Sequence, residues 1–166
     1  LKEGLYEDQE NREKILAVAR FNTTASDTPR SLDEIVADMK EGQDDIFYIT
    51  GETLETVTHS PQLEGFRARG IEVLLMTDPV DEFWWPAIGS YQEKPFKSVT
   101  RGGADLDKIK GADDAATDKK KDKKSPAGMD DLIAALKISL GEAVKDVTVS
   151  ERLTDSPVCL VSGEGD

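Results

Sequence analysis

The stretches IFYIT at residues 46–50 and IEVLLMT at residues 71–77 decide the fold. Both are nearly continuous apolar runs, rich in β-branched and aromatic residues. Such runs indicate strands that are covered on both faces, as in a parallel sheet. A third, weaker strand is expected at PFKSVT, residues 95–100. With helical segments between the strands, we expect an α/β fold: a small three-layer α/β/α domain with a short, mostly parallel sheet and right-handed crossovers.

Helix signals lie around these strands. EDQENREKILAVARF, residues 7–21, has acids in its first turn and an apolar stripe, which predicts one helix. A second helix is expected to begin at Ser31, because SLDE matches the capping-box pattern. Ser60-Pro61 and Asp78-Pro79 each pair an N-cap residue with a proline suited to the first helical position.

The composition changes after Arg101 and divides the chain into three predicted parts. Residues 1–101 form an α/β domain, and residues 102–128 form a Gly-, Ala-, Lys- and Asp-rich linker with almost nothing to fill a core. Residues 129–166 begin with an amphipathic helix, followed by two expected strands at 144–150 and 157–161. One helix and two strands cannot close a core alone, so we expect the incomplete start of a second, α+β domain and an excised fragment.

The charge and cysteine content limit the partners. The net charge is −13, which disfavours nucleic acid and anionic membranes as the main partner. No apolar run approaches the roughly 20 residues of a membrane span. The single Cys159 cannot form an internal disulfide.

The stretch PVDEFWWPAIG, residues 79–89, raises the question of which tryptophan is buried. On a helical wheel one face collects Val80, Phe83, Trp84, Ala87 and Ile88, so Trp84 is expected in the core. Trp85 points away from that stripe, beside Asp81, and Pro86 is expected to end or kink the helix. An exposed Trp85 among carboxylates would suit a weak protein-binding surface. The alternative is that Trp85 packs under the following turn or against another domain.

Signals of catalysis are weak. His59 is the only histidine and has no Cys or carboxylate at ligand spacing, and neither a P-loop nor a GxGxxG motif is present. We therefore expect no catalytic, metal-binding or cofactor-binding residues in this chain. An alternative function is that of a small-ligand-binding α/β domain, with its site at the strand ends around Thr50-Gly51 and Thr77-Asp78.

Six stretches, read as an ordered set, resemble the heat-shock protein 90 family in its bacterial HtpG type. They are LKEGLYED (1–8), ARFNTT (19–24), SLDEIVADMKEGQDDIFYITGET (31–53), SPQLEGFRARGIEVLLMTDPVDEF (60–83), KPFKSVT (94–100) and VKDVTVSERLTDSP (144–157). The resemblance implies the later part of a middle domain and the first elements of a C-terminal domain. It also implies a cytoplasmic, ATP-dependent chaperone that remodels non-native client proteins together with a DnaK-type chaperone.

The resemblance places the catalytic parts outside this chain. It implies that ATP and Mg are bound by an N-terminal domain, that the catalytic arginine lies upstream of Leu1, and that helices beyond this sequence form the homodimer. This fragment is then a client- or co-chaperone-binding module and not an enzyme. In the family an acid-plus-aromatic pair faces the client, and Glu82-Phe83 occupies that place. With the helical wheel, this makes Asp81, Glu82, Phe83 and Trp85 the expected client-binding residues.

Overall fold

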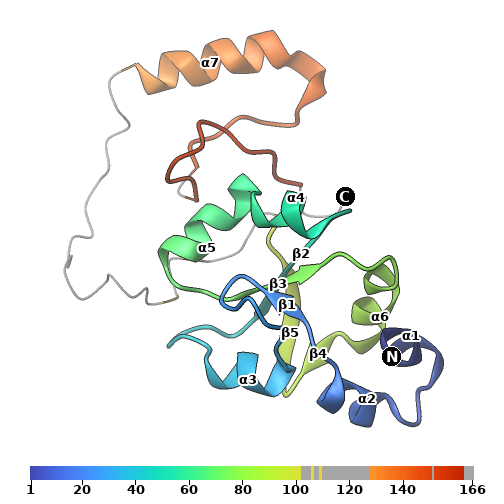
Figure 1. The fold of residues 1–166 in the computed structure, drawn as a ribbon. Helices are drawn as coiled ribbons and strands as arrows, with labels where there is room; N and C mark the ends of the chain where they lie inside the picture. Colours follow the sequence, from blue (N-terminus) through green and yellow to red (C-terminus); the bar gives the residue numbers. More distant parts are fainter. Residues whose placement is uncertain (102–105, 107–108, 110–127, 151, 163–166) are drawn as a thin grey trace.

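The computed structural model describes residues 1–101, 106, 109, 128–150 and 152–162, and its centre is a five-stranded sheet (Figure 1). The strand order is β1-β3-β2-β5-β4. Strand β2 (Ile46–Thr50) runs parallel to both of its neighbours, β3 (Val73–Met76) and β5 (Lys94–Ser98). The edge strands β1 (Asn22–Thr23) and β4 (Ser90–Tyr91) pair antiparallel. The predicted α/β class and mostly parallel sheet are confirmed.

Helices cover both faces of the sheet, which explains why β2 and β3 are apolar throughout (Figure 1). Phe47 and Ile49 of β2 join one buried cluster, whereas Ile46 and Tyr48 join the other. One face carries α4 (Leu54–Thr58), η1 (Pro61–Leu63) and α5 (Glu64–Ala68), and the other carries α1 (Lys2–Glu7), α2 (Arg12–Val18), α3 (Leu32–Ala37) and α6 (Asp81–Ile88). The three-layer arrangement is therefore confirmed.

The connections between the parallel strands lie on opposite faces. The chain passes from β2 to its neighbour β3 through α4 and α5, and returns across β2 to β5 through α6. The second crossover runs across the sheet in the opposite direction to the first and also covers the opposite face. The two crossovers therefore have the same hand. The ends of β2 and β3 thus lie where the connections diverge, which is the usual ligand position in open α/β sheets.

Local capping explains where the helices begin. The predicted capping box is present: the Glu34 amide donates to Ser31 Oγ at 3.3 Å, and the Ser31 amide donates to Glu34 Oε2 at 2.7 Å. Ser60 caps η1, with Pro61 at its first position. The single helix predicted over 7–21 was wrong, because the chain forms α1 and α2 with a turn between them, where Asp8 accepts from the Asn11 amide.

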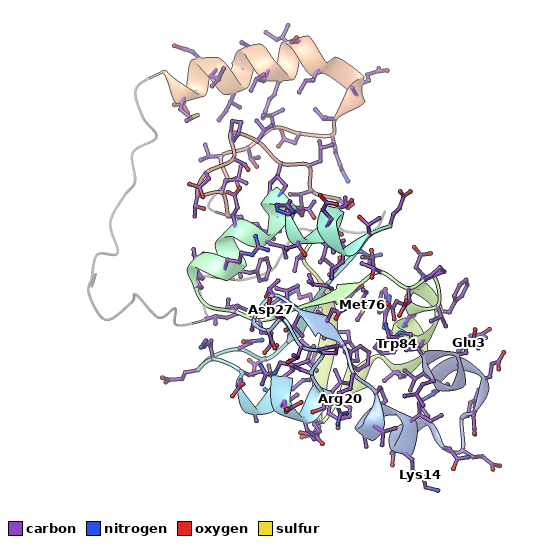
Figure 2. The ribbon with its side chains drawn as sticks, viewed as in Figure 1. Glu3, Lys14, Arg20, Asp27, Met76 and Trp84 are labelled. Carbon is purple, nitrogen blue, oxygen red and sulfur yellow. The ribbon has the colours of Figure 1, made fainter. Side chains whose placement is uncertain are left out.

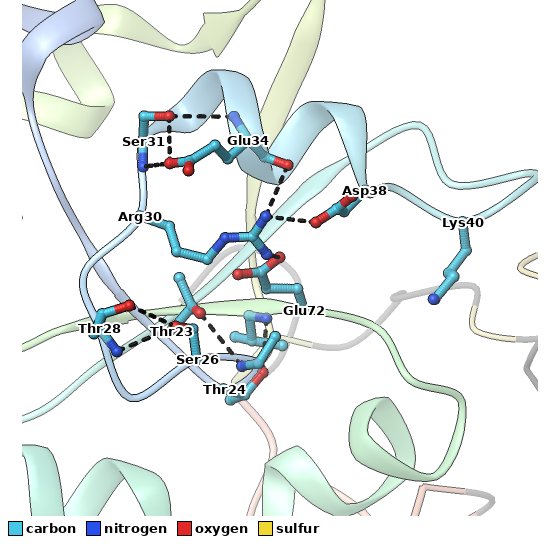
Figure 3. A network of polar contacts seen from close by, with 12 residues as sticks. Thr23, Thr24, Ser26, Thr28, Arg30, Ser31, Glu34, Asp38, Lys40 and Glu72 are labelled. Atoms are coloured by element: carbon cyan, nitrogen blue, oxygen red, sulfur yellow. Dashed lines mark hydrogen bonds and ion pairs between the residues drawn. The ribbon is translucent and has the colours of Figure 1, made fainter.

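An ion-pair network joins α3 to the sheet (Figure 3). The Arg30 guanidinium lies 2.7 Å from a Glu72 oxygen just before β3 and 2.5 Å from an Asp38 oxygen just after α3. The hydrogen bond to Asp38, followed by the charge of Glu72, raises the pKa of Arg30 above its usual value. Residues far apart in the sequence are thereby held together beside the short edge strand β1.

The C-terminal part differs from its prediction. Helix α7 (Met129–Leu140) forms as expected and is followed by η3 (Gly141–Ala143). The strands predicted at 144–150 and 157–161 are absent, because alternation stabilises a strand only where a neighbouring strand pairs with it. Residue 162 makes an isolated bridge to Arg101 instead. Within the described residues no helix is long and apolar enough to cross a membrane.

Two residues of the predicted linker, which was expected to hold almost nothing to fill a core, are core residues. Leu106 and Ile109 are each 5% exposed and pack in the same cluster as Phe66 and Val99. Apolar side chains spaced three apart were overlooked within a charged, Gly-rich segment. The rest of the 102–128 prediction falls on residues outside the described structure.

Candidate functional site

Helix α6 carries the residues that the sequence singles out, but its buried stripe is shifted by one position. Asp81 and Trp84 are buried, and Trp85 and Ile88 are half-buried against the same core cluster. Counted from Asp81, these positions lie at offsets of 0, 3, 4 and 7 residues, so they form one helical face. The helical wheel correctly predicted Trp84 in the core. It was wrong for Asp81 and Trp85, because it assigned the acid Asp81 to the polar side. Pro86 lies inside the helix, which continues to Ile88.

Asp81 is buried because it satisfies three donors. Its carboxylate accepts from the Trp84 indole Nε1 at 2.8 Å and from the Asp78 amide at 3.1 Å, and it lies 2.9 Å from Lys2 Nζ. Trp84 itself lies in the interior, between α6 and the sheet (Figure 2). Asp81 is 1% exposed, so its expected place on the binding surface is corrected. Asp78 does not cap α6 either, since the N-cap residue is Val80.

Trp85 is not free in solvent, and this corrects the prediction of its exposure. Its ring centroid lies 4.6 Å from that of Tyr48 in the central strand β2, so that α6 covers the sheet through this ring. Burial raises the pKa of Tyr48 above its usual value. Trp85 therefore packs within the fold, on a strand that neither of the two earlier readings named as its partner.

Phe83 and Glu82 lie on the outer face of α6. The Phe83 side chain is 58% exposed, and its ring centroid lies 6.3 Å from that of Tyr6, which is 55% exposed. Tyr6 comes from α1, which packs against α6. We call Tyr6, Glu82 and Phe83 the aromatic corner. The sequence did not single out Tyr6, because its contact with Phe83 joins segments that are distant in the chain.

The surroundings of the aromatic corner are acidic. Glu3 and Glu7 on α1 are exposed on the same helix as Tyr6, and Asp78 is exposed before α6. Exposed aromatic rings retain a favourable free energy of transfer from water, and neighbouring carboxylates attract basic groups. The arrangement can therefore bind peptide segments that combine apolar and basic side chains.

The strand ends proposed for a small ligand make contacts within the protein. The Gly51 amide donates to Met76 O at 3.2 Å, and a Cβ at Gly51 would collide with Val57 of α4. Asp78 is paired with Lys2 at 2.6 Å. A shallow hollow of about 510 Å³ lies beside Asp78, lined by residues of α1, the 18–20 segment and Val80, but not by Thr50 or Gly51.

The remaining reactive side chains lie apart from the corner. His59 is exposed at the end of α4, with its Nδ1 2.8 Å from Glu55 O. Cys159 is half-buried, in a segment without strand structure. Over the part of the chain that the structure describes, no three His, Cys, Asp or Glu side chains gather as metal ligands would.

Known proteins are similar to this chain in sequence and in fold. The sequence pattern of the family described as Hsp90 protein matches residues 1–165. Chaperone protein HtpG of Paramagnetospirillum magneticum is 54% identical over 166 residues, which cover 100% of this chain and 26% of that protein. Chaperone protein HtpG of Rhodospirillum rubrum is 53% identical over 167 residues, which cover 99% of this chain and 27% of that protein. The middle domain of a Plasmodium falciparum heat shock protein aligns with a TM-score of 0.55 and 34% identity over 60% of this chain and 43% of that one. The chain thus spans about a quarter of the length of its curated relatives.

Proposed function

We propose a function from the premise that this chain belongs to the Hsp90 protein family: it is the part of an ATP-dependent chaperone that contacts non-native client proteins. The relatives are named as chaperones, and the structural neighbour is a middle domain. The chain acts by binding and performs no catalysis of its own. In the whole protein, ATP and Mg are bound by a different domain.

The exposed aromatic pair is the observation that supports this proposal. Phe83 and Tyr6 each leave more than half of the side chain in water, although a fully buried core lies directly beneath them. Asp81 and Trp84 of the same helix are buried, so Phe83 lies on the solvent side of α6. An exposed aromatic cluster with acidic neighbours fits a surface that holds the apolar and basic segments of unfolded chains.

Weak binding at one corner suits a dimeric chaperone. An aromatic contact of this kind contributes about 1–2 kcal/mol, so a single corner holds a client only transiently. We propose that the whole protein is a cytoplasmic homodimer, paired through C-terminal helices beyond this sequence, and that a DnaK-type chaperone passes clients to it. Two corners in one dimer would then add avidity to the weak single contact.

Replacing Phe83 tests the proposal. Phe83→Ala should weaken binding of reduced, carbamidomethylated lysozyme, a permanently unfolded basic polypeptide, by about 5- to 30-fold, because one aromatic contact is lost. Fluorescence anisotropy of the labelled polypeptide measures the affinity. Tyr6→Ala should have a smaller effect in the same direction.

The matched control is Leu54→Ala. Leu54 is 44% exposed on α4, which covers the opposite face of the sheet, so its loss removes apolar surface at a distance from the corner. It should leave the affinity unchanged. If Phe83→Ala binds the polypeptide as tightly as the original chain, the corner is not the client site.

A further inference from the structure

The carboxylate of Glu64 holds a distant segment of the chain. Glu64 is the first residue of α5, and its Oε2 accepts from the backbone amides of Thr154 at 2.8 Å and Asp155 at 3.0 Å. Its Oε1 accepts from the Ser156 amide at 3.1 Å and from the Ser156 hydroxyl. Three consecutive amides and one hydroxyl thus converge on one carboxylate. We call this arrangement the Glu64 clasp.

The surface beside Glu64 is shaped for close approach of the same segment. A Cβ at Gly65 would lie 2.8 Å from the Arg152 carbonyl oxygen, so only glycine fits there without a shift. The Arg152 guanidinium donates to Val99 O at 3.1 Å, at the end of the sheet. Further along, the Ser162 amide donates to Thr100 O at 2.9 Å.

Apolar burial contributes little to this docking. Every residue from 152 to 162 is described, and none of them is buried. Val158 and Leu160 are 68% and 79% exposed. Segments that are not held by a core depend on their hydrogen bonds, and bonds to an ionised carboxylate are the stronger kind.

We infer that Glu64 is the positioning residue of this joint: its carboxylate holds residues 152–162 against α5 and so connects the C-terminal part of the chain to the sheet. The role is distinct from the client contact, because α5 lies on the opposite face of the sheet from the aromatic corner. The joint releases when the carboxylate is lost, while the sheet and its helices stay folded.

Amide hydrogen exchange on the 166-residue chain tests the inference. Glu64→Gln keeps the shape of the side chain but removes the charge and replaces one acceptor oxygen with a donor. Exchange at the Thr154, Asp155 and Ser156 amides should then become at least about ten-fold faster. Exchange at Leu74 in β3 should not change. Ser156→Ala, which removes only the hydroxyl donor, should give a smaller increase at the same three amides.

The matched control is Glu55→Gln, which removes one charge from an exposed position on α4. It should leave the three amides as they are. Unchanged exchange at 154–156 in Glu64→Gln would overturn the inference. An equal increase at Leu74 would also overturn it, since Glu64 would then support the whole fold and not the joint.

Discussion

At the scale of single residues, Asp81 determines how α6 lies on the fold. Its buried carboxylate holds the Trp84 indole N–H and Lys2, so one acid connects α1 and the interior of α6. Buried acids with this many partners are tolerated because each donor replaces a lost bond to water. The burial of Asp81 fixes the rotation of α6 about its axis and so places Glu82 and Phe83 of the aromatic corner on the outer face.

Removing the Asp81 carboxylate should destabilise the chain. Asp81→Ala leaves the Trp84 indole N–H buried without an acceptor and removes a partner of Lys2, so the free energy of unfolding should fall by about 2–3 kcal/mol. Urea unfolding followed by tryptophan fluorescence measures it. The neighbouring exposed acid serves as a control, since Glu82→Ala should change stability by less than about 0.5 kcal/mol. Similar values for both variants would contradict the role given to Asp81.

At the scale of elements, α6 has one face packed on the sheet and another exposed to solvent, which is the proposed binding face. Trp85 lies on the Tyr48 ring of the central strand, whereas Phe83 extends toward Tyr6 and solvent. The two aromatic residues are close in the sequence, yet their substitution should have opposite consequences. Loss of the Trp85 ring should lower the stability of the fold, whereas loss of the Phe83 ring should weaken binding of unfolded polypeptides.

Comparison of two alanine variants checks this division. Trp85→Ala removes a half-buried ring from the cluster and should lower the free energy of unfolding by about 2–3 kcal/mol. Phe83→Ala should lower it by less than about 1 kcal/mol, because most of its ring is already in water. Thermal and urea unfolding give both values. A larger loss for Phe83→Ala than for Trp85→Ala would reverse the assignment of the two faces.

The sequence predicted elements well where their own residues determine them. IFYIT became β2 with its predicted bounds, and the Ser31 capping box formed, because both signals are local. The α6 register failed because burial of Asp81 depends on Lys2 and Trp84 in the folded state. The strands expected at 144–150 and 157–161 failed because pairing partners are set by tertiary structure. Tyr6 was missed for the same reason: its contact with Phe83 joins distant segments.

At the scale of the whole molecule, two parts of the chain are joined by polar contacts. The Glu64 clasp is the densest of these, and the charged residues on the segment it holds are Arg152 and Asp155. Arg152 is directed to Val99 O and Arg101 O, and the Asp155 carboxylate is 3.5 Å from Thr154 Oγ1. Glu64 therefore faces amide and hydroxyl donors.

The joint should depend on pH in a defined direction. The hydroxyl of Ser156, then the amides of Asp155 and Thr154, lower the pKa of Glu64 from 4.5 to about 2. Because the folded value lies below the unfolded one, the clasp contributes fully above about pH 4.5 and is lost as the pH falls through about 2. Carbon NMR of the Glu64 carboxyl should show this low pKa, and the Ser156 amide shift should titrate with it. A Glu64 pKa near 4.5 would contradict the hydrogen bonds described.

The short outer strands limit how an extended polypeptide can pair with the sheet. The sheet is bordered on each side by an antiparallel strand of two residues, β1 and β4. A long open border would present a ladder of unpaired amides and carbonyls, on which an extended polypeptide could add itself as a further strand. Outer strands this short offer an extended chain little template for cross-β growth. Under the proposed function, client polypeptides would therefore be held by contacts with their side chains and not by strand addition to this sheet.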